Sequence, residues 1–427
     1  MGWEMGIRLK SFSLVTFGYV VLVVAHLSCQ SRNSDTATKS VASPETLKEN
    51  PSEMEVADFL SQTDHSQLAL GRVHGDLAEC PGVIPKLKMG FGHRGPTLYR
   101  SALMAFLSQL GYLENEELIL KQAQMLGLTH VKLEEDSTVD GDILILWNDK
   151  DVIVSFVGSK TKRDWIQNLK MGKTKSPSFG MVHRGFYEVY HGGKKRFDGV
   201  EDETMAAITK AGYWSPFWTS VDQAEASALD AAQKAGKNKR LTIVGHSQGG
   251  AIATLFAADF GSRFALASEK GSYTNLSPES LVCSEIQASK HSRMEAFVFS
   301  APRVGDSVFQ KCVEKIWNGN VYKLSHTDDV ISWTAPDQEN AFTNAEGFAE
   351  YSAVYKTDFR SNVKTTDGSE LLPKERRPGN SWTQVAGLAS RLKLRGVIAK
   401  HGEITSDLFK TIDPTCTASF FMEPEKK

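Results

Sequence analysis

The sequence lacks the features that mark several large protein classes. It has no phosphate-binding loop of the GxxxxGK type, no internal repeat and no metal-ligand motif, so we expect neither a cofactor nor a metal ion. Its formal net charge is only -2, which gives no reason to expect a nucleic-acid partner. With 427 residues, 41% of them hydrophobic, the chain can instead form one large α/β domain with appendages.

Long hydrophobic runs are also scarce. The run from Ser11 to Leu27 is too short for a comfortable membrane span, but it suits the apolar core of a signal peptide because Arg8 and Lys10 precede it. Leu27-Ser28-Cys29 follows and resembles a bacterial lipoprotein signal, in which Cys29 would carry the lipid. The sequence therefore predicts an exported chain.

This interpretation divides the chain into three parts. We expect a lipoprotein-type signal peptide over residues 1–28, a flexible polar tether over 29–51, and a folded domain with an N-terminal helical segment over 52–427. His26 departs from the lipoprotein pattern. Cleavage after Ala25, which would release a soluble secreted protein, therefore remains the alternative.

Cysteine is rare, at five residues. Without Cys29, an even number remains: Cys80, Cys283, Cys312 and Cys416. In an oxidising compartment these could form two disulfides, and the sequence leaves all three connectivities open.

The most informative segment is Gly245-His246-Ser247-Gln248-Gly249. It follows the apolar stretch Leu241–Val244 and precedes a helix expected from Gln248 to about Phe260, which is the context of a nucleophile elbow. The turn is so tight that the flanking glycines can carry no side chain, and it holds Ser247 strained and exposed. His246 should point to the opposite side and pack under the elbow.

Hydrophobic patterning predicts the fold class. Strands at Ile143–Trp147 and Val152–Val157 flank a polar turn and should form a hairpin. Further strands are expected at Leu241–Val244, Ala296–Phe299 and Val321–Leu324, and helices at Ser52–Leu70, Ser101–Leu126 and Val221–Ala235. This alternation favours an α/β fold with a mostly parallel central sheet and helices on both faces.

Several segments in order resemble the class 3 lipases, the fungal-lipase-like branch of the α/β-hydrolases. They are Ser155–Ser159 with Asp164–Leu169, Val182–Phe186, the elbow Gly245–Ala253, Phe299–Asp306 and Ser325–Val330. The resemblance implies an α/β-hydrolase fold and a Ser-Asp-His triad.

A serine nucleophile needs an imidazole base, and the imidazole needs a carboxylate that fixes its tautomer. In α/β-hydrolases the acid and then the histidine follow the serine. Asp329 follows the expected strand Val321–Leu324 and matches the family's acid, with Asp328 as the neighbouring rival. His401 is the only histidine after the acid and is the expected base. His326 and His183 are expected to be structural.

The oxyanion of the reaction needs at least two donors. The backbone N–H of Gln248 should supply one, and the resemblance assigns the other to Ser159, through its backbone N–H, with its hydroxyl as an additional candidate. Two departures concern loop rigidity: Val157 replaces the family's usual Arg, which removes an ion pair, and Ser332 replaces a usual Pro after the acid.

The resemblance places a lid directly after Ser159. Trp165, Ile166 and Leu169 would form one apolar stripe on a short helix there, able to cover the site or to meet a lipid surface. An amphipathic helix permanently docked on the core is the alternative. The longer insertion before His401, including basic Lys374–Arg377, could be a substrate-side flap or a solvated excursion.

These features together predict a serine acyl-ester hydrolase of lipase type, acting on acylglycerols or small esters and contacting a membrane or lipid interface. A phospholipase A1, a feruloyl-type esterase and an acyltransferase would use the same groups. A non-catalytic surface binding protein on the same fold is the alternative from another class.

Overall fold

The computed structural model describes residues 72–113, 115–134, 142–160, 173–176, 179–192, 240–270, 294–326, 329, 331–333, 354–356, 374–375, 401–416 and 421. The expected signal peptide, tether, lid and helices at Ser52–Leu70 and Val221–Ala235 lie outside the described residues, as do Cys29 and Asp328.

An eight-stranded sheet forms the centre of the domain, in the order β1-β2-β3-β6-β7-β8-β9-β10. The run from β3 to β9 is parallel, and the pairings β1–β2, β2–β3 and β9–β10 are antiparallel. The strands are β1 (His130–Glu134), β2 (Ile143–Trp147), β3 (Asp151–Phe156), β6 (Arg240–His246), β7 (Met294–Phe299), β8 (Val321–Ser325), β9 (Val354–Lys356) and β10 (Lys374–Glu375). The predicted mostly parallel α/β architecture is confirmed.

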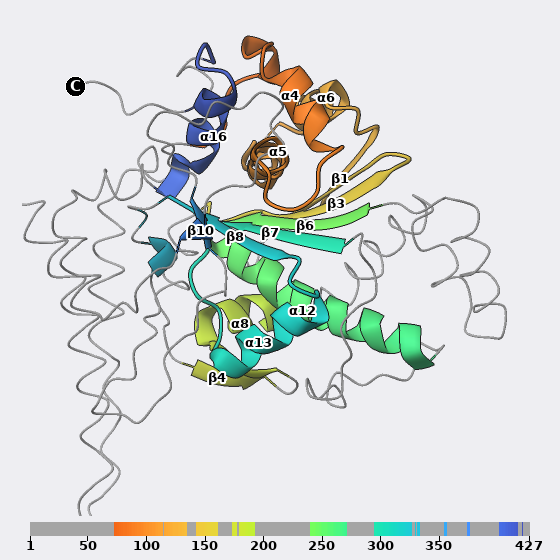
Figure 1. Cartoon of the computed structure of the whole chain (residues 1–427), viewed down its shortest axis with the longest axis vertical. Coiled ribbons are helices and arrows are strands. Elements are labelled where there is room, and N and C mark those ends of the chain that lie inside the picture. Colours follow the sequence, from red (N-terminus) through yellow and green to blue (C-terminus); the bar gives the residue numbers. More distant parts are fainter. Residues whose placement is uncertain are drawn as a thin grey trace, which may run out of the picture.

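Helices cover both faces of this sheet, as Figure 1 shows. On one face lie α4 (Ile84–Gly90), α5 (Leu98–Gln109), α6 (Glu116–Met125) and α16 (Ile404–Ile412), with the 3-10 turns η1 (Leu77–Glu79) and η2 (Leu110–Tyr112). On the other lie α8 (Arg184–Gly192), α12 (Gln248–Lys270) and α13 (Ser307–Ile316), with a two-stranded sheet of β4 (Lys173–Ser176) and β5 (Gly180–His183).

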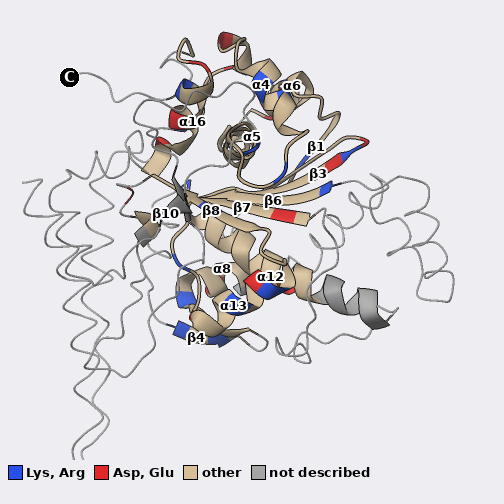
Figure 2. Ribbon diagram, viewed as in Figure 1, with Lys and Arg blue, Asp and Glu red and all other residues tan. Residues whose placement is uncertain are grey.

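The two faces enclose two hydrophobic cores, and alternation along the strands supplies both. In β2, Ile143 and Ile145 belong to the core under α12, whereas Leu144 and Leu146 belong to the core under α5. A strand buried on both faces reads as a continuous apolar run, which is why β2 and β3 are easy to find in the sequence. Positively charged Lys and Arg and negatively charged Asp and Glu are interspersed over the outer elements (Figure 2).

The hairpin at the start of the sheet also matches its prediction. In its turn, Asn148 Oδ1 accepts hydrogen bonds from the backbone N–H groups of Lys150 and Asp151, both at 2.8 Å. Such Asx contacts explain why polar residues occupy this turn. The prediction did not include β1, the outermost strand, whose central residues are only half-buried.

The single helix expected at Ser101–Leu126 is wrong. The chain forms α5 and α6, separated by η2 and by Leu113. A side chain at Gly111 would collide with Val157, and Asn115 caps the new helix by accepting a hydrogen bond from the Leu118 N–H at 3.0 Å. A local cap and a tertiary contact therefore outweigh the continuous apolar periodicity.

The sequence suggested either a substrate-side flap or a solvated excursion for the insertion before His401, and its described residues instead include two strands of the central sheet. Its described residues form β9 and β10, and β9 pairs with β8, so part of the insertion extends the central sheet.

A disulfide joins Cys80, beside η1, to Cys416, just after α16, with a Cα–Cα distance of 4.9 Å. Cys312 is disulfide-bonded as well. Of the three connectivities left open by the sequence, those that pair Cys80 with Cys283 or Cys312 are excluded. Within the described part of the chain, no helix is both long enough and apolar enough to cross a membrane.

Candidate active site

Strand β6 and helix α12 form the sharp turn on which Ser247 stands. Ser247 has a φ of 59°, in the left-handed region that a non-glycine residue rarely occupies. A Cβ on Gly245 would lie 2.3 Å from the carbonyl oxygen of Gly249, and one on Gly249 would lie 2.1 Å from that of Phe156. The local geometry is therefore that of a nucleophile elbow.

Three residues expected to work together do meet at this turn. His401 Nε2 lies 2.7 Å from Ser247 Oγ. On the other side of the same ring, His401 Nδ1 lies 3.0 and 3.1 Å from the two carboxylate oxygens of Asp329. All three residues are buried. This serine-imidazole-carboxylate chain can move a proton from the serine hydroxyl to Nε2 while the carboxylate stabilises the resulting cation.

Backbone N–H groups hold the carboxylate of Asp329 in place. Its Oδ1 accepts hydrogen bonds from the N–H groups of Ile331 and Ser332, at 3.1 and 3.3 Å. Ser332 also donates its hydroxyl to the carbonyl oxygen of Asp329, at 2.8 Å. A proline at position 332 could make neither bond, so hydrogen bonding here takes over the rigidity that the family's usual proline supplies.

The two expected oxyanion donors contact each other through their side chains. The Ser159 hydroxyl donates to Gln248 Oε1 at 3.1 Å, and both residues are buried. The Ser159 hydroxyl proton is therefore directed at Gln248. Gln248 is the first residue of α12, so its N–H has no partner within the helix.

The oxyanion loop has supports that the sequence did not suggest. Arg72 Nη2 donates to the Ser159 carbonyl oxygen at 2.6 Å, and the guanidinium lies 4.2 Å from the centre of the Tyr112 ring. Lys160 pairs with Asp142 at 2.5 Å. Val157 removes one ion pair from this loop relative to the family pattern, and Arg72, from a distant part of the sequence, provides a different anchor.

Loss of the Arg72 anchor should impair turnover more than binding. We expect Arg72→Ala to lower kcat on a soluble ester by about 10- to 100-fold with little change in KM, because small misplacements of catalytic groups have effects of that order. Arg72→Lys should be intermediate, since lysine keeps the charge but not the planar fork. Exposed Arg94 is the matched control, and Arg94→Ala should be neutral. Equal kcat for Arg72→Ala and Arg94→Ala would contradict this role.

His246 packs beneath the elbow, as its alternation along β6 predicts. Its Nε2 lies 3.1 Å from the backbone oxygen of His401, which can only accept, so Nε2 carries the proton. Its Nδ1 therefore accepts from the Tyr112 hydroxyl, also at 3.1 Å. Through this chain, Tyr112 and His246 hold the backbone of the expected base.

Burial lowers the pKa of His246 to about 3, and the nearby His401 and Arg72 act in the same direction. The hydrogen bond to the His401 backbone oxygen and the carboxylate of Asp329 oppose this shift. Burial also lowers the pKa of His183 to about 3. The His183 ring stacks on Phe186 with 4.0 Å between centroids, which fits a structural role. Both imidazoles are consequently neutral in the folded protein.

These two histidines predict acid lability. Unfolding raises each pKa to about 6.5, so the unfolded chain binds more protons and the free energy of unfolding falls as the pH drops from 6.5 towards 3. Each histidine contributes up to about 1.4 kcal/mol per pH unit over that window and nothing above it. Urea unfolding at several pH values measures how steeply the free energy of unfolding depends on pH, which gives the number of protons taken up on unfolding. His183→Leu should lower that number by up to one. An unchanged slope in that variant would contradict the assignment.

The remaining predicted residues separate into two groups. His326 lies in the loop that carries Asp329, and its Nε2 faces Asp407 of α16 at 3.5 Å, consistent with a structural position. The proposed lid residues Trp165, Ile166 and Leu169 lie outside the described residues. Sequence reasoning missed Arg72 and Tyr112, because no local motif marks either one.

The known proteins that this chain resembles are lipases and phospholipases. A model of the family described as lipase (class 3) matches residues 153–339, a range that contains Ser247 and Asp329 but not His401. Phospholipase A1-IIgamma of Arabidopsis thaliana is 26% identical over 270 residues, which cover 61% of this chain and 51% of that protein. Secreted mono- and diacylglycerol lipase 1 of Fusarium solani is 26% identical over 222 residues, covering 51% and 50%.

The chain thus spans about half the length of these curated relatives. Among solved structures, lipase II from Rhizopus niveus is 16% identical, with a TM-score of 0.37 over 70% of this chain and 85% of that one. The matched range begins in β3 and includes the elbow and the loop after β8, which are the segments that form the site. Residues 153–339 thus match the class 3 lipase family, and the chain has an α/β-hydrolase fold.

Proposed function

We propose that this protein hydrolyses carboxylic esters of lipids through an acyl-enzyme on Ser247. One observation carries the proposal: Ser247 Oγ, the His401 ring and the Asp329 carboxylate form a continuous hydrogen-bonded chain at a nucleophile elbow. Chemistry of this kind requires no metal ion or cofactor from the protein.

The proposed reaction has two halves. Ser247 Oγ attacks the ester carbonyl carbon while its proton passes to His401 Nε2, and the backbone N–H groups of Ser159 and Gln248 stabilise the tetrahedral oxyanion. Collapse breaks the bond to the alcohol, which leaves with the proton from Nε2. Water then attacks the acyl-enzyme with His401 again acting as base, which releases the acid and restores the serine.

Acylglycerols are the substrate class we favour, since a secreted mono- and diacylglycerol lipase is among the relatives. A phospholipase A1 activity is the second candidate, because two Arabidopsis relatives carry that name. An aryl-esterase or acyltransferase would use the same groups.

A substrate panel separates these candidates. Initial rates should be measured on a triacylglycerol, a diacylglycerol, a phosphatidylcholine and a short p-nitrophenyl ester, with Ser247→Ala as the blank. The proposal expects acylglycerol turnover to dominate. Preferential release of the sn-1 chain from phosphatidylcholine would favour the phospholipase, and no Ser247-dependent turnover of any ester would contradict enzymatic function.

The lid belongs to this proposal as well. Trp165, Ile166 and Leu169 would cover the site when closed and meet a lipid surface when open. The rate should then rise disproportionately once an ester exceeds its solubility limit, and Trp165→Ala should impair emulsion hydrolysis more than hydrolysis of dissolved esters. Smooth saturation through that limit would favour a permanently docked helix.

Export is the location we propose. The disulfide between Cys80 and Cys416 supports it, because such bonds persist mainly in oxidising compartments. Anchoring through lipidated Cys29 is the finer proposal. Detergent partitioning of the native protein, lost in Cys29→Ala, would support anchoring, whereas a mature N-terminus at His26 would contradict it.

A further inference from the structure

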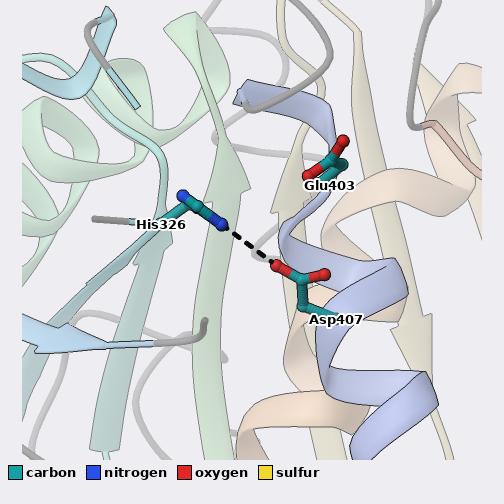
Figure 3. Close-up of side chains that lie close together, drawn as sticks. All are labelled: His326, Glu403 and Asp407. Atoms are coloured by element: carbon teal, nitrogen blue, oxygen red, sulfur yellow. Dashed lines mark ion pairs between the residues drawn. The ribbon is translucent and has the colours of Figure 1, made fainter. Parts of the chain in front are cut away.

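A second group of polar side chains lies beside the triad. His326 stands directly after β8, and Glu403 and Asp407 stand at the beginning of α16. One ligand atom from each residue lies within 4.8 Å of those of the other two. Figure 3 shows His326 and Asp407 pointing toward one another, with Glu403 on the same helical segment as Asp407. His326 lies far in the sequence from Glu403 and Asp407, so no spacing motif reveals the group.

The distance between His326 and Asp407 suits two metal ligands better than a strong hydrogen bond. His326 Nε2 lies 3.5 Å from Asp407 Oδ2, which is beyond the range of about 2.7–3.2 Å for good N–H···O bonds. Two ligands held about 2.0–2.1 Å from a tetrahedral zinc ion lie about 3.3–3.4 Å apart. The pair is therefore spaced almost as it would be around such an ion.

Charge in the cluster points the same way. Glu403 and Asp407 are four residues apart, so their two negative charges share one helix face, where like charges repel. The imidazole of His326 is buried, whereas both carboxylates are partly exposed, which leaves a path to solvent for an ion and for a water ligand. A divalent cation bound between the two carboxylates would offset their mutual repulsion.

The kinds of ligand atom in the cluster indicate which cation would bind there. Calcium and magnesium prefer sites made entirely of oxygen, whereas one imidazole nitrogen with two carboxylates suits zinc and related transition metals. We propose that His326, Glu403 and Asp407 bind one zinc ion, with water completing the coordination. This assignment revises the expectation from sequence that the chain binds no metal.

The site lies where it would join the two halves of the triad. The carbonyl oxygen of His326 accepts a hydrogen bond from the Asp329 N–H at 3.1 Å, so the ligand and the expected acid share one turn. Glu403 follows His401 by two residues. A zinc ion here ties the acid-bearing loop to the base-bearing segment without contacting the ester, and it acts as a structural link.

Thermal unfolding in the presence of zinc chloride tests the proposal without any ester substrate. The full chain, stripped with a chelator and dialysed, should gain about 5 °C or more in Tm when free zinc is a hundred times its Kd. Isothermal titration should give one ion per chain. Asp407→Asn and Glu403→Gln preserve shape, and each should weaken zinc binding by at least about tenfold.

Glu117→Gln is the matched control, because Glu117 is an exposed helical carboxylate on α6. It should keep the full zinc shift. Equal shifts in Asp407→Asn, Glu403→Gln and Glu117→Gln would overturn the site, as would a shift produced by calcium but not by zinc. If Asp407→Asn fails to fold, Glu403→Gln and His326→Gln decide the question. Because these readouts need no catalysis, their failure leaves the proposed esterase function standing.

Discussion

Ser247→Ala is expected to abolish both ester hydrolysis and covalent labelling by a fluorophosphonate. The Ser247 hydroxyl lies 2.7 Å from His401 Nε2 and is positioned to donate its proton to that nitrogen. His401→Ala should lower kcat/KM at least about a thousandfold, because members of a triad act as one unit. Initial rates on a soluble p-nitrophenyl ester measure both effects.

Asp329→Asn should be nearly as damaging, since an amide would favour the wrong tautomer of His401. Exposed Asp149 provides a matched control, and Asp149→Asn should keep full activity. The acid assignment would be wrong if Asp328→Asn abolished activity while Asp329→Asn retained it.

The second large effect concerns stability. The disulfide joins Cys80 to Cys416 across 336 residues of sequence, so its loss frees a long loop in the unfolded chain. The double variant Cys80→Ala/Cys416→Ala should lose about 2–5 kcal/mol of unfolding free energy, measured by urea denaturation.

Activity should respond differently from stability in that variant. Cys416 follows α16, the helix just after His401, so thermal inactivation should come earlier while the rate at 25 °C changes little. An unchanged free energy of unfolding would contradict a stabilising role, and treatment of the wild-type protein with a reductant provides an independent comparison.

The sequence predicted best what local physics determines. A side chain at Gly245 or Gly249 would collide with backbone atoms close by. The elbow can therefore be predicted from its own short sequence motif. The strands β2, β3, β6, β7 and β8 could be found because burial on both faces produces continuous apolar runs.

The residues that could not be predicted from the sequence are those whose role depends on contacts with distant parts of the chain. Arg72 reaches Ser159 across 87 positions, and Tyr112 reaches His246 across 134. Neither residue carries a local pattern that distinguishes it from an ordinary surface arginine or core tyrosine. The break between α5 and α6 depends likewise on the contact between Gly111 and Val157, which apolar periodicity does not register.

Peptide mapping after fluorophosphonate labelling tests the central claim most directly. Intact-mass analysis of the wild-type protein should show one adduct per chain, and tandem mass spectrometry should place it on Ser247, with no adduct in Ser247→Ala and far slower labelling in His401→Ala. A wild-type protein that is folded but unlabelled, or an adduct on another serine, would contradict the account.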